Sequence, residues 1–204
     1  MTGQATIEFW YEFASTYSYP AAMTITERAA ARGVCVRWRP FLLGPIFASQ
    51  GWHDSPFNLQ PEKGRYMWRD IERLCAAEGL AFHRPDVFPQ HSLLAARLAL
   101  ALADRGLLPD FTRHAYQAQF ADREDISNRD LLMRILADVG ADPLELLAKA
   151  ESEPLKQRLR DAVDEAKSLG IFGAPSFIAG GELFWGFDRM DMALNHACGG
   201  PGGG

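Results

Sequence analysis

Two serines stand three residues apart where the sequence changes from an alternating to a helical pattern. Residues 6–13 (TIEFWYEF) alternate with a period of two, which predicts a β-strand. A helix is expected from about residue 17 to residue 31, ended by Gly33. Ser15 and Ser18 therefore lie at a helix N-terminus, whose N–H groups stabilise anions, including thiolates. The Ser15 hydroxyl adds a donor there, although serine is also a common N-cap.

A second sequence block, residues 170–177 (GIFGAPSF), places Ala174 and Pro175 directly before another predicted strand. Proline is tolerated at the start of a strand, so this block alone is weak evidence. In thioredoxin-type folds, however, a loop with a cis-proline faces the helix N-terminus that carries Cys-x-x-Cys. Here Ser15 and Ser18 occupy that spacing. We therefore expect no disulfide exchange by these residues, but a site that can bind a thiol arriving with its ligand.

The elements that position these two blocks begin as a β-strand, a helix and a second β-strand. Residues 34–40 (VCVRWRP) alternate again and stop at Pro40, which completes a βαβ unit with parallel strands. Residues 41–62 are expected to be a long irregular stretch, and residues 64–150 have helical patterns.

The C-terminal part returns to mixed structure. A helix with one apolar face is expected to run from residue 155 to residue 169. Residues 176–179 and 182–185 predict a β-hairpin around a Gly-Gly turn. Asp188 and Asp191 are expected as the N-cap and N3 residues of a last short helix.

This order of elements predicts an α/β protein with a thioredoxin-like fold and an inserted all-helical domain, as in DsbA-like proteins. Residues 1–62 and 151–198 are expected to form the thioredoxin-like domain, and residues 63–150 the helical insertion. The glycine-rich residues 199–204 are expected to be a disordered tail.

Composition excludes several classes of function. The chain has 204 residues, 48% of them hydrophobic, and a formal net charge of −5, which argues against a nucleic-acid or anionic-membrane partner. Cys35, Cys75 and Cys198 are too far apart for a disulfide framework or a metal site, and the first two are expected to be small buried residues. The sequence shows no signal peptide and no apolar run near ~18 residues, which predicts a cytoplasmic protein without a membrane span.

Four blocks, in order along the chain, carry a family resemblance. They are FWYEFASTYSYPA (9–21), PEKGRYMWRDIERL (61–74), GIFGAPSF (170–177) and FWGFDRMDMAL (184–194). Together they resemble the kappa-class glutathione transferases and the 2-hydroxychromene-2-carboxylate isomerases of the DsbA-like group. The resemblance implies a homodimer that uses glutathione to isomerise an aromatic or unsaturated carboxylate by reversible thiolate addition.

The same resemblance assigns roles to individual residues. Ser15 matches the serine that contacts and activates the glutathione sulfur. Lys63 matches a lysine of the glutathione site, although a solvated loop lysine is the alternative. Ala174, next to Pro175, matches the residue whose backbone pairs with the tripeptide in the manner of a β-strand.

Asp188 matches an acidic residue that takes the γ-glutamyl ammonium group, and an N-cap role is compatible with this. Arg189 is expected to face either the ligand or the solvent. The sequence also departs from the family. Thr16 replaces the usual proline, Phe187 stands where kappa enzymes have a serine ligand, and His91 stands where isomerases tend to have asparagine. The 50–58 loop differs as well, so no asparagine ligand is assigned.

Aromatic side chains offer a substrate pocket as a further hypothesis. Trp52, Phe57, Trp68 and Trp185 are candidates to line it, although large aromatic residues more often pack in cores. His53 is a candidate general acid or base, but a lone loop histidine is usually only exposed.

Three functions remain open from the sequence. The first is a glutathione-dependent isomerase, and the second is a kappa-like glutathione transferase that needs the same thiolate. The third is a redox-inactive scaffold that binds thiols or peptides without turnover. A disulfide oxidoreductase is the least favoured because Ser15 and Ser18 lack sulfur.

Overall fold

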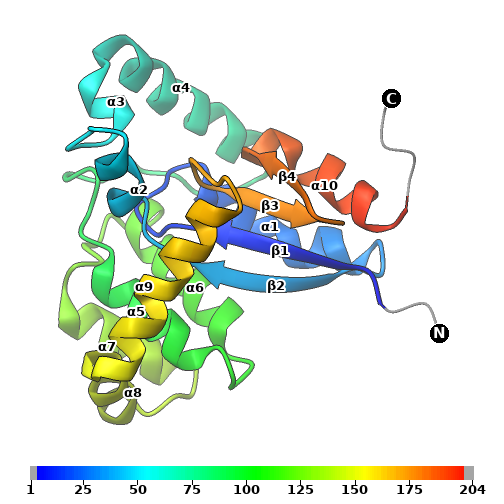
Figure 1. Cartoon of the computed structure of the whole chain (residues 1–204). Coiled ribbons are helices and arrows are strands. Elements are labelled where there is room, and N and C mark those ends of the chain that lie inside the picture. Colours follow the sequence, from blue (N-terminus) through cyan, green and yellow to red (C-terminus); the bar gives the residue numbers. More distant parts are fainter. Residues whose placement is uncertain (1–3, 200–204) are drawn as a thin grey trace.

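A mixed four-stranded sheet forms the centre of the protein, seen in Figure 1 as a computed structural model that describes residues 4–199. The strand order is β2-β1-β3-β4. β1 (Thr6–Tyr11) pairs in parallel with β2 (Cys35–Pro40) and antiparallel with β3 (Ser176–Ala179), which pairs antiparallel with β4 (Glu182–Trp185). The predicted βαβ unit and hairpin are confirmed, and the fold is the expected α/β thioredoxin-like one.

β1 is buried on both of its faces. On one face, Phe9 packs in the main core with α1 (Ser18–Ala30) and α10 (Met190–Ala197). On the other face, Trp10 is fully buried in a second cluster to which α9 (Glu153–Ser168) contributes. Figure 1 shows α9 crossing one side of the sheet and α1 lying on the other. The strand is therefore covered on both sides, as the apolar Trp10 predicted.

Five helices fill the predicted helical block. They are α4 (Pro61–Ala77), α5 (Leu93–Leu102), α6 (Leu108–Phe120), α7 (Arg129–Asp138) and α8 (Pro143–Glu151). In Figure 1, α4 lies at the top of the molecule, while α5 to α8 lie together at its lower left. The insertion therefore supplies two separate groups of helices around the sheet.

The prediction that residues 41–62 are irregular was wrong. This stretch contains α2 (Gly44–Ser49) and α3 (Pro56–Leu59), and α4 already begins at Pro61. Each of these helices has a proline in its first turn, where the fixed φ of proline suits a helix and no N–H is needed. The prolines therefore begin helices here.

The predicted N-cap role of Asp188 was also wrong. Residues Phe187–Arg189 form a short 3-10 helix, and the N-cap position of α10 is Arg189, which makes no capping bond through its side chain. Gly186 precedes this turn with a φ of +102°, and a Cβ atom there would lie 2.5 Å from Asp188 Oδ1. The Asp188 side chain is therefore packed back over Gly186.

The two cysteines expected to be buried differ from each other. Cys75 is buried in α4, and burial raises the pKa of its thiol to about 12. Cys35 is the first residue of the edge strand β2 and is exposed, so its expected burial was wrong. Residues 200–204 of the predicted tail lie outside the described residues.

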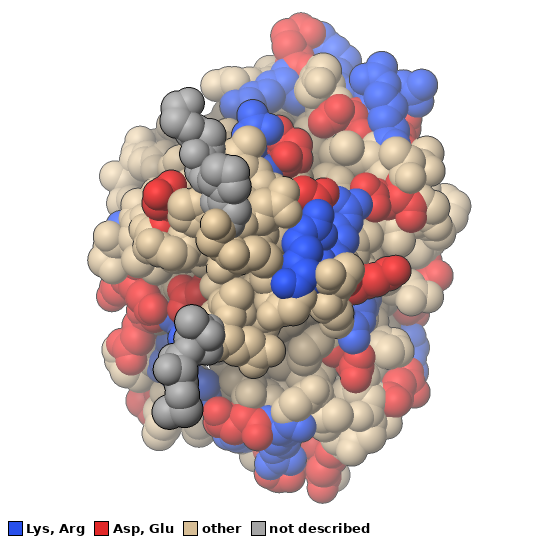
Figure 2. Space-filling view, turned by 90° about the vertical axis from the view of Figure 1, so that its right-hand side faces the viewer, with Lys and Arg blue, Asp and Glu red and all other residues tan. Residues whose placement is uncertain are grey.

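Surface charge follows the composition. Figure 2 shows lysine and arginine interspersed with aspartate and glutamate over the face that it displays. No helix of the described chain is long and apolar enough to cross a membrane.

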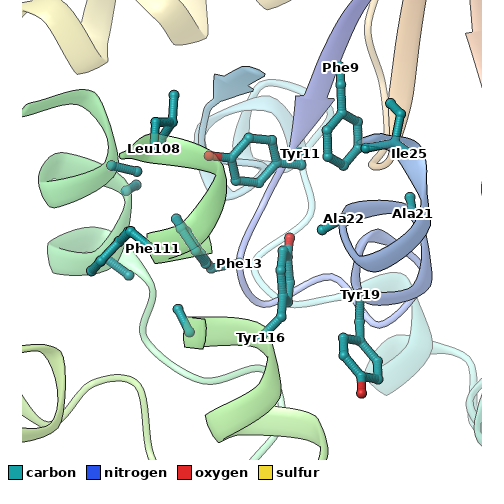
Figure 3. Packing of buried hydrophobic residues seen from close by; sticks show 14 of the residues in the cluster. Phe9, Tyr11, Phe13, Tyr19, Ala21, Ala22, Ile25, Leu108, Phe111 and Tyr116 are labelled. Carbon is teal, nitrogen blue, oxygen red and sulfur yellow. The ribbon is translucent and has the colours of Figure 1, made fainter. Parts of the chain in front are cut away.

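A buried polar network joins the end of β1 to the helices of the insertion. The carboxyl of Glu12 is buried and accepts hydrogen bonds from Ser92 Oγ and, at 3.2 Å, from the Ala14 N–H. The Tyr116 hydroxyl donates to the Glu12 carbonyl at 2.8 Å. Figure 3 shows Tyr116 among the aromatic side chains that pack here, with Phe13 beside it. The turn after β1 is therefore anchored by hydrogen bonds to the start of α5 and to α6.

Glu12 makes stability depend on pH. Burial raises its pKa from 4.5 to about 7, against the lowering effect of its two hydrogen bonds. Between these values the unfolded chain holds fewer protons, so the free energy of unfolding falls as pH rises, by roughly 3 kcal/mol in all. We expect Glu12→Gln to lose this dependence, as measured by urea unfolding of both proteins from about pH 5 to about pH 8. A constant stability difference between them over that range would contradict this expectation.

Gly64 is the point of closest approach between α3 and α4. A Cβ atom there would lie 2.2 Å from the Phe57 carbonyl oxygen. Because backbone must move, we expect Gly64→Ala to lower the free energy of unfolding by about 1–3 kcal/mol. Gly44→Ala is the matched control, since its Cβ would meet nothing within 4 Å, and it should change stability by less than about 0.5 kcal/mol. Equal denaturation midpoints for the two variants would show that the approach is not tight.

Candidate functional site

The Ser15 hydroxyl lies in a tight turn between β1 and α1. The Ser15 N–H donates to the Glu12 carbonyl at 2.9 Å, and the Ser18 N–H donates to the Ser15 carbonyl at 3.2 Å. The Ser18 N–H is also 3.3 Å from Ser15 Oγ, while the N-cap position of α1 is Tyr17, which makes no capping bond through its side chain. Ser15 is thus not the N-cap residue, although its hydroxyl accepts one N–H of the first turn. The helix N-terminus points its N–H groups at this turn.

The loop before β3 closes the other side of the site. Ser15 Oγ donates to the Ala174 carbonyl at 2.8 Å, and the Ala174–Pro175 peptide bond is cis. The Gly186 N–H donates to the Pro175 carbonyl at 2.9 Å, which ties this loop to the end of β4. The structure therefore brings together Ser15, Ala174 and Pro175, as the sequence predicted.

Tyr17 and α4 form a wall beside this turn. The Tyr17 hydroxyl donates to Asp70 Oδ2 at 3.0 Å, and its ring centroid lies 6.2 Å from that of Phe57. The Lys63 ammonium group lies 6.0 Å from the Phe57 ring centroid. Lys63 is exposed. Phe57 thus lies between Lys63 and Tyr17, and the binding role of Lys63 stays a prediction.

A second carboxylate, that of Asp188, contributes to the electrostatics of Tyr17. The Tyr17 pKa is raised by partial burial first, and by the negative charges of Asp70 and Asp188 as well. Arg189 pairs with Asp188 at 3.0 Å, with both side chains exposed. Asp70 is thus the carboxylate bonded to the Tyr17 hydroxyl, and the charge of Asp188 makes a smaller contribution to the raised pKa.

The neighbouring Phe187 packs inward. Its side chain is buried, and the guanidinium of Arg28 lies 5.5 Å from its ring centroid. Phe187 therefore replaces the family's serine with a packing residue, and its side chain offers a ligand no hydrogen bond.

Most of the other aromatic candidates pack elsewhere. Trp52 stacks near Phe47, and Trp68 packs on Phe82 and Phe88. Trp185 is half exposed. Its indole nitrogen lies so close to Gly173 that a Cβ atom on that residue would be only 2.4 Å away from it. Trp185 thus borders the loop before β3.

His53, the candidate acid or base, and His91 are both exposed. Their imidazoles have no polar partner among the described residues, and the role of His53 stays a prediction. Phe57 and Trp185 are the aromatic candidates that the fold leaves near the Ser15 turn.

Three residues of the site were missed by the sequence reasoning. Tyr17 and Asp70 form its polar wall, and Glu12 lies beneath it. A signal was available for Asp70, because Lys63, Tyr66 and Asp70 are spaced i, i+3 and i+7 and share one face of α4. Glu12 gave no such signal, since a polar residue in an alternating strand is read as exposed.

The arrangement suits an anion held next to a backbone pairing site. A half-buried hydroxyl sits between a helix N-terminus and a backbone carbonyl. Asp70 bonds to the nearby Tyr17, and Lys63 lies over the Phe57 ring that packs near Tyr17. A hydroxyl and N–H groups stabilise a thiolate, and charged side chains of both signs suit a zwitterionic ligand. Among residues 4–199, no group of three or more metal-ligating side chains is placed to hold a metal ion.

Comparison with known proteins places the chain in a family. A sequence profile of the DSBA-like thioredoxin domain matches residues 6–197. The chain is 27% identical over 189 residues to 2-hydroxychromene-2-carboxylate isomerase of Sphingobium xenophagum, covering 92% of this chain and 95% of that protein. It is 26% identical over 208 residues to glutathione S-transferase kappa 1 of Homo sapiens, covering 95% and 91%.

A solved structure of a 2-hydroxychromene-2-carboxylate isomerase superposes with a TM-score of 0.85 at 20% identity, covering 95% of this chain and 94% of that one. This similarity confirms the fold. Together with the profile match, it establishes that the chain belongs to the DSBA-like thioredoxin domain family, with isomerase and kappa-class transferase relatives.

Proposed function

We propose that this protein is a glutathione-dependent isomerase of the 2-hydroxychromene-2-carboxylate isomerase type. The observation that supports it most is the Ser15 hydroxyl, held between the α1 N-terminus and the Ala174 carbonyl where disulfide oxidoreductases carry cysteine. Its substrate is a small aromatic or unsaturated carboxylate. The proposal includes homodimeric assembly, carried over from the family resemblance, and the cytoplasmic location expected from the sequence.

Glutathione fits the residues of the site. Ser15 would face its sulfur, the Ala174 carbonyl would accept from a peptide N–H, and Lys63 would pair with a carboxylate. Asp188 and Asp70 would take the ammonium group, and Arg189 would face the adjoining carboxylate. When bound, glutathione supplies a thiolate nucleophile that adds reversibly to a conjugated carbon.

Ser15 has two hydrogen-bonding states available for this work. In the described structure its hydrogen is donated to the Ala174 carbonyl. Rotation about χ1 directs the same hydrogen to a bound thiolate and leaves the Ala174 carbonyl free to accept from the ligand. The helix N-terminus adds its positive end, so the bound thiol loses its proton more readily than the free thiol, whose pKa is near ~8.5.

A kappa-like glutathione transferase is the second candidate function. The supporting observation is the similarity to human glutathione S-transferase kappa 1 over 95% of this chain. Both functions need the same thiolate, and they differ in whether the sulfur leaves the substrate again. The exposed Trp185 beside the loop before β3 offers an aromatic surface that suits either substrate class.

Ser15→Ala tests the thiolate site. We expect calorimetry to show glutathione binding to the wild type, and ultraviolet absorbance to show the bound thiol ionised near neutral pH. Loss of a hydrogen bond to a charged sulfur should lower the thiolate fraction of the variant by about tenfold or more. Ser168→Ala is the matched control, because its hydroxyl donates to the Glu165 carbonyl on an exposed helix end. The absence of binding at millimolar glutathione would end the proposal.

Product analysis separates the two functions. With a conjugated aromatic carboxylate that has no leaving group, we expect an isomer to form while the amount of glutathione stays constant. With an electrophile that carries a leaving group, a transferase would release a conjugate and consume glutathione in equal amount. Mass spectrometry of both mixtures measures this directly. Stoichiometric consumption of glutathione together with no isomer would favour the transferase.

A further inference from the structure

Glu12 is a buried acid directly beneath the thiol site, and the proposed chemistry gives it no part. Its carboxyl is held between β1, the turn of Ser15 and the start of α5. One oxygen accepts from Ser92 Oγ and the other from the Ala14 N–H at 3.2 Å. The Glu12 carbonyl also accepts from the Ser15 N–H at 2.9 Å. The carboxyl thus contacts Ala14 and the main-chain carbonyl contacts Ser15, both in the turn that positions the Ser15 hydroxyl.

Nothing nearby compensates a charge on Glu12. Among the described residues, no lysine, arginine or histidine forms an ion pair with it, and no positive charge contributes to its pKa. The titratable group that faces it from α6 is Tyr116, whose own pKa is raised by burial and by the charge of Glu12. From α1, the uncharged Ser18 faces Tyr116, and His91, next to Ser92, is exposed. An ionised Glu12 therefore depends on two hydrogen bonds for its stabilisation.

A thiolate at Ser15 would be a second negative charge near the Glu12 carboxyl, which accepts from the N–H of Ala14, the residue before Ser15. The Ser15 N–H donates to the Glu12 main-chain carbonyl, so both residues belong to one tight turn. Two anions on one turn, one of them buried, are not readily ionised together, and the charge of one raises the pKa of the other. Burial already places the pKa of Glu12 at about 7, within the range where a stabilised thiol titrates.

This inference rests on the proposed function. We propose that Glu12 is a positioning residue that shares one negative charge with the thiolate bound at Ser15, so that the pair carries a single charge near neutral pH. As the thiol gives its proton to solvent, Glu12 takes one up from solvent, and the net charge of the pair is unchanged. Thiol ionisation is therefore linked to protonation of a carboxyl that the ligand never touches.

The test places a thiol at position 15 independently of any ligand. Ser15→Cys is made in a Cys35→Ser, Cys198→Ser background, which leaves only Cys75, a buried thiol with a pKa raised to about 12. Thiolate absorbance and the rate of alkylation by iodoacetamide, followed against pH, give the pKa of the introduced thiol. Adding Glu12→Gln, which keeps the hydrogen-bonding shape, should lower that pKa by roughly half a unit to one unit.

Glu8→Gln is the matched control, because it removes an acid four residues earlier, on β1. The Glu8 carboxyl accepts from the Trp10 indole. It should leave the thiol pKa unchanged. By reciprocity, carbon-13 NMR of the Glu12 carboxyl should give a higher pKa in Ser15→Cys than in the wild type, by the same amount. This second measurement keeps Glu12 intact and does not depend on folding of the Glu12→Gln variant.

Equal thiol pKa values with and without Glu12→Gln, or equal Glu12 pKa values with and without the introduced thiol, would overturn the inference. Failure of the wild type to bind glutathione would instead overturn the proposed function, because the introduced thiol needs no glutathione. If glutathione binds, its bound thiol should show the same downward pKa shift in Glu12→Gln. No shift there would likewise contradict the shared charge.

Discussion

One hydrogen bond of 2.8 Å, from Ser15 Oγ to the Ala174 carbonyl, joins segments 159 positions apart, and the sheet is what makes it possible. β1 and β3 run antiparallel with Trp10 opposite Ser176, so the end of β1 lies beside the beginning of β3. The turn that follows one strand must then meet the loop that precedes the other. The site is a consequence of this register.

The helical insertion lies in sequence between these two segments, yet it does not separate them. It instead supplies the underside of the Ser15 turn. Ser92 of the α5 N-terminus binds the Glu12 carboxyl, and Tyr116 of α6 binds the Glu12 carbonyl. Thr112 of α6 also shares a 2.8 Å hydrogen bond with the Tyr11 hydroxyl. Insertion and thioredoxin-like core are therefore coupled through buried polar contacts, which are costly to break one partner at a time.

Sequence reasoning succeeded where local physics decides the structure. The period-two alternation of β1 leaves few alternatives to a strand. Gly180 and Gly181, with φ values of +57° and +85°, likewise leave few alternatives to a hairpin turn. It failed for residues 41–62, because prolines that begin short helices also occur in loops. It failed for Asp188, since the choice between a 3-10 turn and a capped helix depends on packing around Gly186.

The candidate site divides in the same way. Ser15, Ala174 and Pro175 were predictable because a spacing at a strand–helix junction can be read directly. The contact of Tyr17 with Asp70 was not, because it spans 53 positions; helical spacing places Asp70 on one face of α4 but does not say that Tyr17 meets that face. Contacts of this kind are set by the tertiary fold, which short sequence patterns do not encode.

The absence of a cysteine at Ser15 changes what a buried acid beneath it does. Beside a resident thiol, an acid such as Glu12 would act on the sulfur in every state of the protein. With Ser15 there, the negative charge arrives only with a ligand, and the cost of burying Glu12 as an anion is present until then. A charged Glu12 is held by Ser92 Oγ and the Ala14 N–H, so a ligand thiolate at Ser15 would be a second anion close by, with donors of its own. On this reasoning the replacement of sulfur by a hydroxyl makes the protonation of the buried acid depend on whether a thiol ligand is bound.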